Sequence, residues 1–67
     1  MTVGEIIRQK RTERGWSQRK LADKCGVSTL SVWGWENDQF FPTLIFLICL
    51  ADTFGITLDE LVGRSRR

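Results

Sequence analysis

Seven cationic side chains between positions 8 and 24 are the clearest candidates for a binding function in this sequence, because only Glu13 and Asp23 oppose their charge there. This local excess of five positive charges is suited to binding phosphates along a nucleic acid. A solvated surface that only keeps a protein soluble would have the same composition, so neighbouring elements must decide between the two interpretations. Residues 25–63 contain no Lys or Arg, and the charge is therefore uneven although the net charge is only +2. The seven cations are Arg8, Lys10, Arg11, Arg14, Arg19, Lys20 and Lys24.

Residues suited to catalysis or metal binding are scarce. The sequence has no His, which removes the commonest general base and the commonest metal ligand. Cys25 and Cys49 lack the paired spacing of a zinc site, and neither a Gly-rich phosphate loop nor a nucleophile motif is present. We therefore expect no enzyme activity, no metal, no cofactor and no small-molecule ligand. Both thiols are expected to be buried or half-buried, with a disulfide as the alternative.

The length and composition predict one small soluble domain. A chain of 67 residues, 42% apolar and 27% charged, is typical of a single compact domain, which we place at residues 1–63, with residues 64–67 as a basic flexible tail. The N-terminal segment is charged where a secretory signal would be apolar. The longest apolar run, residues 44–51, is far shorter than the ~20 residues of a membrane-spanning helix. These features favour a cytoplasmic protein.

Five helices and no strand follow from the hydrophobic spacing and the end signals. Two capping boxes, Thr2 with Glu5 and Thr57 with Glu60, predict where the first and last helices begin. Single N-caps are expected at Ser17, Ser28 and Thr43, and helix ends at Gly15, Gly26, Gly55 and Gly63. The expected helices cover residues 3–14, 18–24, 29–37, 44–54 and 58–62.

The second and third of these helices are joined by a short turn. The first has apolar residues at Leu21, Ala22 and Cys25, the second has them at Val32 and Trp35, and a Gly stands at the turn. This layout predicts a helix-turn-helix, whose second helix is built to lie in the major groove of DNA. With the neighbouring cations, it favours the phosphate-binding interpretation of the charge.

The sequence also resembles the helix-turn-helix domains of phage repressors and Cro proteins, including the xenobiotic-response-element-type bacterial regulators, over about residues 3–63. The resemblance implies an all-α, compact five-helix lambda-repressor-like fold. It implies a sequence-specific transcriptional regulator, bacterial or phage-encoded, that acts on the nucleoid in the cytoplasm and most simply as a repressor. The matching residues are Ser17-Gln18, Leu21-Ala22, Gly26-Val27-Ser28, Val32, Trp35-Glu36-Asn37 and Pro42, with Arg11 and residues 50–61 outside the core motif.

Roles can be carried over from the family position by position. The resemblance implies that Gln18 contacts a phosphate and sometimes a base, and that Arg11 forms a partly buried salt bridge with Glu36. The groove-facing positions contain no Arg, Lys, Gln or Asn, which leaves contact with thymine methyl groups as the natural chemistry. The predicted DNA-binding residues are Lys10, Arg14, Ser17, Gln18, Arg19, Lys20, Lys24, Ser28, Thr29, Leu30, Trp33, Gly34 and Thr43.

The fourth predicted helix is more apolar than one buried face requires. Its expected core face comprises Leu44, Leu47, Ile48, Leu50, Ala51 and Phe54, with Ile45, Phe46 and Cys49 on or beside the wet side. Phe40 and Phe41 stand just upstream, and either fold back on the core or join an exposed apolar patch. Such a patch predicts a homodimer that binds double-stranded DNA at a palindromic operator. The alternative function is a protein-interaction module of the same fold, an antitoxin-like or anti-repressor partner.

Overall fold

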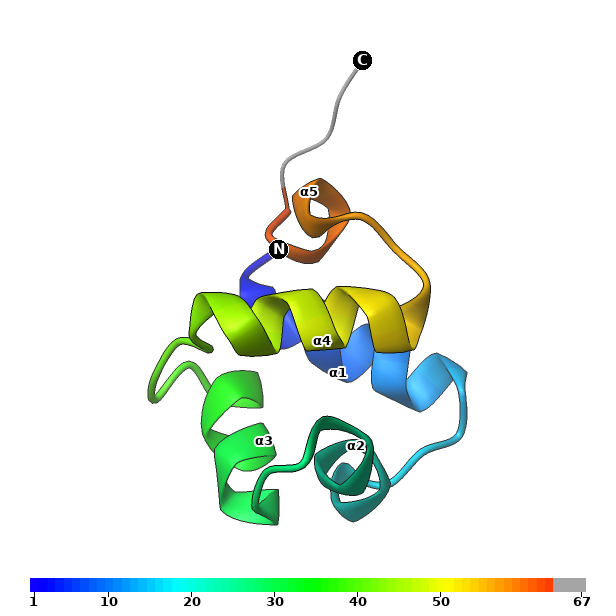
Figure 1. Cartoon of the computed structure of the whole chain (residues 1–67). Helices are drawn as coiled ribbons and strands as arrows, with labels where there is room; N and C mark the ends of the chain where they lie inside the picture. Colours follow the sequence, from blue (N-terminus) through cyan, green and yellow to red (C-terminus); the bar gives the residue numbers. More distant parts are fainter. Residues whose placement is uncertain (64–67) are drawn as a thin grey trace.

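The computed structural model describes residues 1–63, which fold into five helices and no strand (Figure 1). The predicted all-α class is confirmed, and each helix boundary lies within one residue of its expected position. The predicted basic tail, residues 64–67, lies outside the described residues. No helix within residues 1–63 is long and apolar enough to cross a membrane. The helices are α1 (Val3–Glu13), α2 (Gln18–Cys25), α3 (Thr29–Glu36), α4 (Leu44–Phe54) and α5 (Leu58–Leu61).

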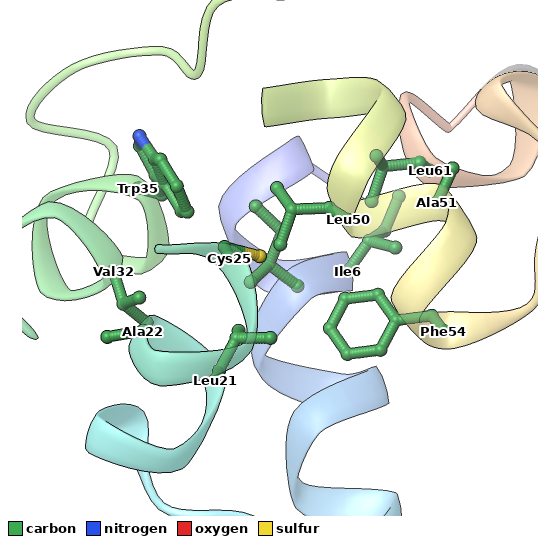
Figure 2. Close-up of a cluster of buried hydrophobic side chains, with 11 residues drawn as sticks. Ile6, Leu21, Ala22, Cys25, Val32, Trp35, Leu50, Ala51, Phe54 and Leu61 are labelled. Atoms are coloured by element: carbon green, nitrogen blue, oxygen red, sulfur yellow. The ribbon is translucent and has the colours of Figure 1, made fainter. Parts of the chain in front are cut away.

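A single cluster of buried side chains joins all five helices (Figure 2). In Figure 1, α4 crosses in front of α1, with α2 and α3 on one side of this pair and α5 on the other. The largest fully buried side chains come from every helix, so no helix can be removed without opening the core. These side chains are Ile7, Leu21, Val32, Leu50, Phe54 and Leu61.

Local signals in the sequence fix most helix ends. Both predicted capping boxes are present, and the hydroxyls of Ser17 and Ser28 accept hydrogen bonds from the backbone in the first turns of α2 and α3. Thr43 occupies the N-cap position of α4, but its side chain makes no capping bond. The left-handed φ of 69° at Gly26 lets the chain turn sharply between α2 and α3, which sets the angle between them.

The predicted core face of α4 is partly wrong. Leu44 and Ile48 are exposed, and the buried residues of α4, which are Leu50, Ala51 and Phe54, all lie in its C-terminal half. Phe46, expected beside the wet side, instead packs against Trp35, with ring centroids 5.7 Å apart. The first turns of α4 therefore present an apolar face to solvent.

The N-terminus of α1 approaches the end of α3 so closely that only a Gly fits. A Cβ atom at Gly4 would collide with the backbone oxygen of Trp35 and lie 3.0 Å from that of Glu36. Since backbone atoms cannot rotate away, we expect Gly4→Ala to lower the free energy of unfolding by about 1–3 kcal/mol. Urea denaturation measures this effect. A variant as stable as the parent would show that the two helices do not pack in this way.

The two cysteines are free thiols, as expected from their positions within helices. Cys25 is buried, and burial together with the neighbouring Cys49 raises the pKa of its thiol to about 12. The reactive species of cysteine is the thiolate, so Cys25 is an unreactive part of the core at neutral pH.

Candidate nucleic-acid interface

Helix α3 has one anchored side and one exposed side. Val32 and Trp35 are buried in the core, as predicted. Leu30 is 68% exposed and Trp33 is 45% exposed, and Thr29 is also exposed. Large apolar side chains are usually buried in a small domain, so their exposure at the start of this helix marks a surface available for contact.

A buried carboxylate fixes the position of α3 relative to α1 and α2. The side chain of Glu36 is fully buried and accepts hydrogen bonds from Arg11 at 2.6 and 3.0 Å, which confirms the pair that the resemblance implied. Gln18 donates to it at 3.1 Å and Arg8 at 3.4 Å. Burial alone would raise the pKa of Glu36, but the bonds from Arg11 and Gln18 and the charge of Arg11 outweigh it and lower that pKa below 4.5.

Gln18 is part of this hydrogen-bond network around Glu36. Its amide nitrogen donates to the Glu36 carboxylate, so the side chain lies between α2 and α3 rather than extending fully into solvent. The hydroxyl of Ser17 accepts from the backbone of Lys20 at 3.0 Å, which leaves other N–H groups of the first turn of α2 exposed beside it. The bond from Gln18 to Glu36 thus holds the start of α2 next to the C-terminal end of α3.

Three of the predicted phosphate-binding cations are held by contacts within the domain. Arg14 donates to the carbonyl oxygens of Lys10 and Phe54 and lies over the rings of Trp16 and Phe54. Lys24 lies over the Trp16 ring at 4.7 Å. Lys10 is 3.9 Å from the carboxylate of Glu13. The rings of Trp16 and Phe54 are stacked with their centroids 6.1 Å apart. The π faces of these rings attract cations, which explains the positions of Arg14 and Lys24.

The cations at the start of α2 differ from these three. Arg19 and Lys20 are exposed, and within residues 1–63 neither makes an ion pair. Both stand in the first turn of α2, next to its N-cap. The positive charge still available to an anion is therefore concentrated beside α3.

Gly34 is on the same side of α3 as Leu30 and Trp33, but it is covered, which corrects the expectation that it is open to the groove. It is buried because the ring of Phe40 lies directly over it, where a Cβ atom would collide with three ring atoms. Phe40 stays half exposed at 49% while Phe41 is more exposed, so the two upstream rings behave differently.

A helix-turn-helix family model matches residues 7–61 of the chain. The chain belongs to this helix-turn-helix family. The domain is 36% identical over 65 residues to the immunity repressor protein of Bacillus phage phi105, and 33% identical over 64 residues to the cryptic phage CTXphi transcriptional repressor RstR of Vibrio cholerae. These alignments cover 97% and 96% of the chain but only 45% and 57% of the two relatives. The resemblance to phage repressors is confirmed.

Among solved structures, the domain is similar to the P22 c2 repressor in complex with a synthetic operator, with a TM-score of 0.91 and 26% sequence identity. That comparison covers 97% of this chain and 98% of the other. The helix-turn-helix domain spans between 31% and 57% of the length of the curated relatives it matches. The fold is therefore shared along nearly the whole chain, while the relatives contain further sequence.

Proposed function

We propose that this domain is a sequence-specific DNA-binding transcriptional regulator, most simply a repressor, that places α3 in the major groove. The observation that carries the proposal is the exposed side of α3, with Leu30 and Trp33 outward and Val32 and Trp35 anchored behind them. The named functions of the phage repressors above support it. Such a regulator acts where the DNA is, in the bacterial cytoplasm, and has no need of an enzymatic step.

The predicted residues have different proposed roles. Thr29, Leu30 and Trp33 contact bases. Arg19 and Lys20, with the exposed N–H groups at the start of α2, bind phosphates. Ser17, Ser28 and Thr43 occupy the N-cap positions of α2, α3 and α4 and are proposed as further phosphate contacts, while Gln18 positions α2 against α3. Lys10, Arg14 and Lys24 contribute to the general positive field rather than to direct contacts.

Lys20→Ala tests the proposal that the start of α2 faces the DNA backbone. We expect it to weaken binding to all duplexes about equally and to lower the slope of log affinity against log salt by about one, because one phosphate contact is lost. Fluorescence anisotropy at several salt concentrations measures both quantities. Lys10→Ala is the matched control, since it removes the same charge at a site paired with Glu13, and it should change the slope much less. Equal slopes for Lys20→Ala and the parent would contradict the orientation.

We also propose a homodimer that uses the exposed side of α4. The α4 apolar face comprises Phe41, Leu44, Ile45 and Ile48, all exposed and none charged. A two-fold interface brings each patch against its own copy, so an uncharged apolar patch pairs with itself without repulsion. The loop into α4 lies at the end of the domain opposite the α1–α2 connection (Figure 1). Two half-sites ~34 Å apart would then be bound together.

Selection of duplexes from a random pool, followed by sequencing, tests the function as a whole. We expect enrichment of one sequence with approximate two-fold symmetry, bound with a steep salt dependence. The alternative, a protein-interaction module that uses the same α4 apolar face, predicts no enriched sequence and almost no salt slope on generic duplex DNA. That result would overturn the regulator proposal.

A further inference from the structure

We propose that the domain reads its operator mainly through methyl groups in the major groove. Leu30, Trp33 and Phe40 form one apolar reading surface that binds the 5-methyl group of thymine and accepts 5-methylcytosine in its place. The inference rests on the proposed function, since it names the base chemistry that the same surface recognises. It adds Phe40, which lies outside the helix-turn-helix, to the residues that determine specificity.

The reading surface is built on one side of α3. Leu30, Trp33 and Gly34 are spaced i, i+3 and i+4, which places them next to one another on a helix. Gly34 has no side chain to offer, but the Phe40 ring packs directly on it and fills that position. Leu30, Trp33 and Phe40 remain 68%, 45% and 49% exposed. The loop thus completes an apolar surface that the helix alone would leave interrupted.

Each Gln or Asn amide of α2, α3 and the loop that follows α3 already donates a hydrogen bond inside the domain, which restricts its orientation. Bidentate reading of adenine needs the oxygen and nitrogen of one Gln or Asn amide to face one base. The amide nitrogen of Gln18 donates to Glu36, that of Asn37 donates to the Trp33 carbonyl at 2.8 Å, and that of Gln39 donates to the Asn37 carbonyl at 3.3 Å. Guanine is usually read by Arg or Lys, and residues 25–63 contain neither.

The small hydroxyls on α3 do not replace these groups. The hydroxyl of Ser28 caps the helix by accepting from the backbone N–H of Ser31 and shares a further bond with the Ser31 hydroxyl at 3.1 Å. The Thr29 hydroxyl and the Trp33 indole N–H are single groups without bidentate geometry. In the major groove only thymine among the four bases carries an apolar group, its C5 methyl. An apolar reading surface can therefore distinguish bases mainly by the presence or absence of that methyl group.

Base analogues test the proposal with the duplex enriched by the selection above. Replacing each thymine in turn by deoxyuridine removes the methyl group and leaves base pairing unchanged. We expect about a fourfold loss of affinity at each contacted thymine, the value for burying one methyl group, with no change in salt slope. Replacing the same T·A pair by 5-methylcytosine·guanine should retain most of the affinity, whereas cytosine·guanine should not.

Protein variants show which side chains read the methyl group. Trp33→Ala and Phe40→Ala should reduce the ratio of thymine to deoxyuridine affinity toward one, whereas Phe41→Ala, which removes the neighbouring ring, should leave the ratio unchanged. Gly34→Ala serves as a second route, because its Cβ displaces the Phe40 ring without removing it. None of the four substitutions removes a core side chain, and circular dichroism confirms folding. The ratio is measured on duplexes with a single half-site, so that the loss of dimerisation by a variant does not enter it.

The two proposals can fail separately. Methyl reading is overturned if deoxyuridine duplexes bind as tightly as the parent duplex at every position, or if the enriched sequence has no contacted thymine. In either case, salt-dependent and sequence-selective binding would still support the regulator function. If no duplex is bound selectively, the regulator proposal fails and methyl reading fails with it. A reduced ratio for Phe41→Ala but not for Phe40→Ala would overturn the role of the reading surface defined here.

Discussion

Replacing Arg11 by Leu should lower the free energy of unfolding by about 3–5 kcal/mol, because it leaves the buried Glu36 carboxylate without its main partner. Arg11 donates two bonds to this carboxylate and a third to the Trp16 carbonyl at 2.8 Å. Its side chain is itself only 13% exposed. Since small domains have total stabilities near the low end of about 5–15 kcal/mol, this variant should be only marginally stable at 37 °C.

Arg8→Leu is the matched control for this prediction. Arg8 touches the same carboxylate at 3.4 Å, but its side chain is 53% exposed, so its loss should cost about 1 kcal/mol or less. Urea titrations of the two variants compare them directly. Equal losses would contradict the assignment of Arg11 as the main partner of the buried charge.

The same network predicts part of the acid sensitivity of the domain. The pKa of Glu36 is lower in the folded state than its usual value of 4.5, so the ionised form stabilises the fold above that pH. This stability is lost as the pH falls below 4.5 toward the folded-state pKa. Glu36→Gln should therefore show a shallower loss of stability in acid than the parent, although Glu60, whose pKa is lowered by hydrogen bonds from Thr57, still contributes. If Glu36→Gln lost stability with falling pH as steeply as the parent, Glu36 would be excluded as a source of the acid sensitivity.

The second large effect concerns the α4 apolar face. Ile45→Asp should convert the proposed homodimer to a monomer and weaken binding to a two-fold operator by at least about 100-fold, because joining two binding domains typically adds 10²–10⁴ in affinity. Ile45 is 74% exposed, so the substitution should not disturb the core. Binding to a single half-site should be unchanged. Sedimentation and anisotropy on both duplexes measure these outcomes.

Leu58→Asp is the control for this variant. Leu58 is another exposed apolar residue, but it lies at the start of α5, outside the α4 apolar face. We expect it to leave both the mass in solution and the operator affinity unchanged. A parent protein that is strictly monomeric at high micromolar concentration, with and without operator DNA, would contradict the homodimer.

Much of the fold could be predicted because its signals are local. The capping box at Thr2 and Glu5 and the Gly at position 26 act within a few residues, and the structure contains both. The outward orientation of Leu30 and Trp33 followed from helical spacing once Val32 and Trp35 were assigned to the core. The Arg11–Glu36 pair could be named only through the resemblance, since its partners are far apart in the sequence.

Features that depend on tertiary contacts could not be predicted from the sequence. Helical spacing alone could not show that the buried residues of α4 all lie in its C-terminal half while Leu44 and Ile48 are exposed. Nor could it show that Arg14 and Lys24 fold onto the aromatic surface of Trp16. The packing of Phe40 on Gly34 depends on the path of a loop, which the sequence pattern does not determine.

Titration of the isotopically labelled protein with the selected duplex, followed by nuclear magnetic resonance, tests most directly whether the exposed side of α3 binds DNA. We predict the largest shifts at the Trp33 indole N–H and at the backbone amides of residues 17–20 and 28–33, with little change in α5. Shifts confined to α4 and α5, or none at saturating duplex, would contradict the proposed function.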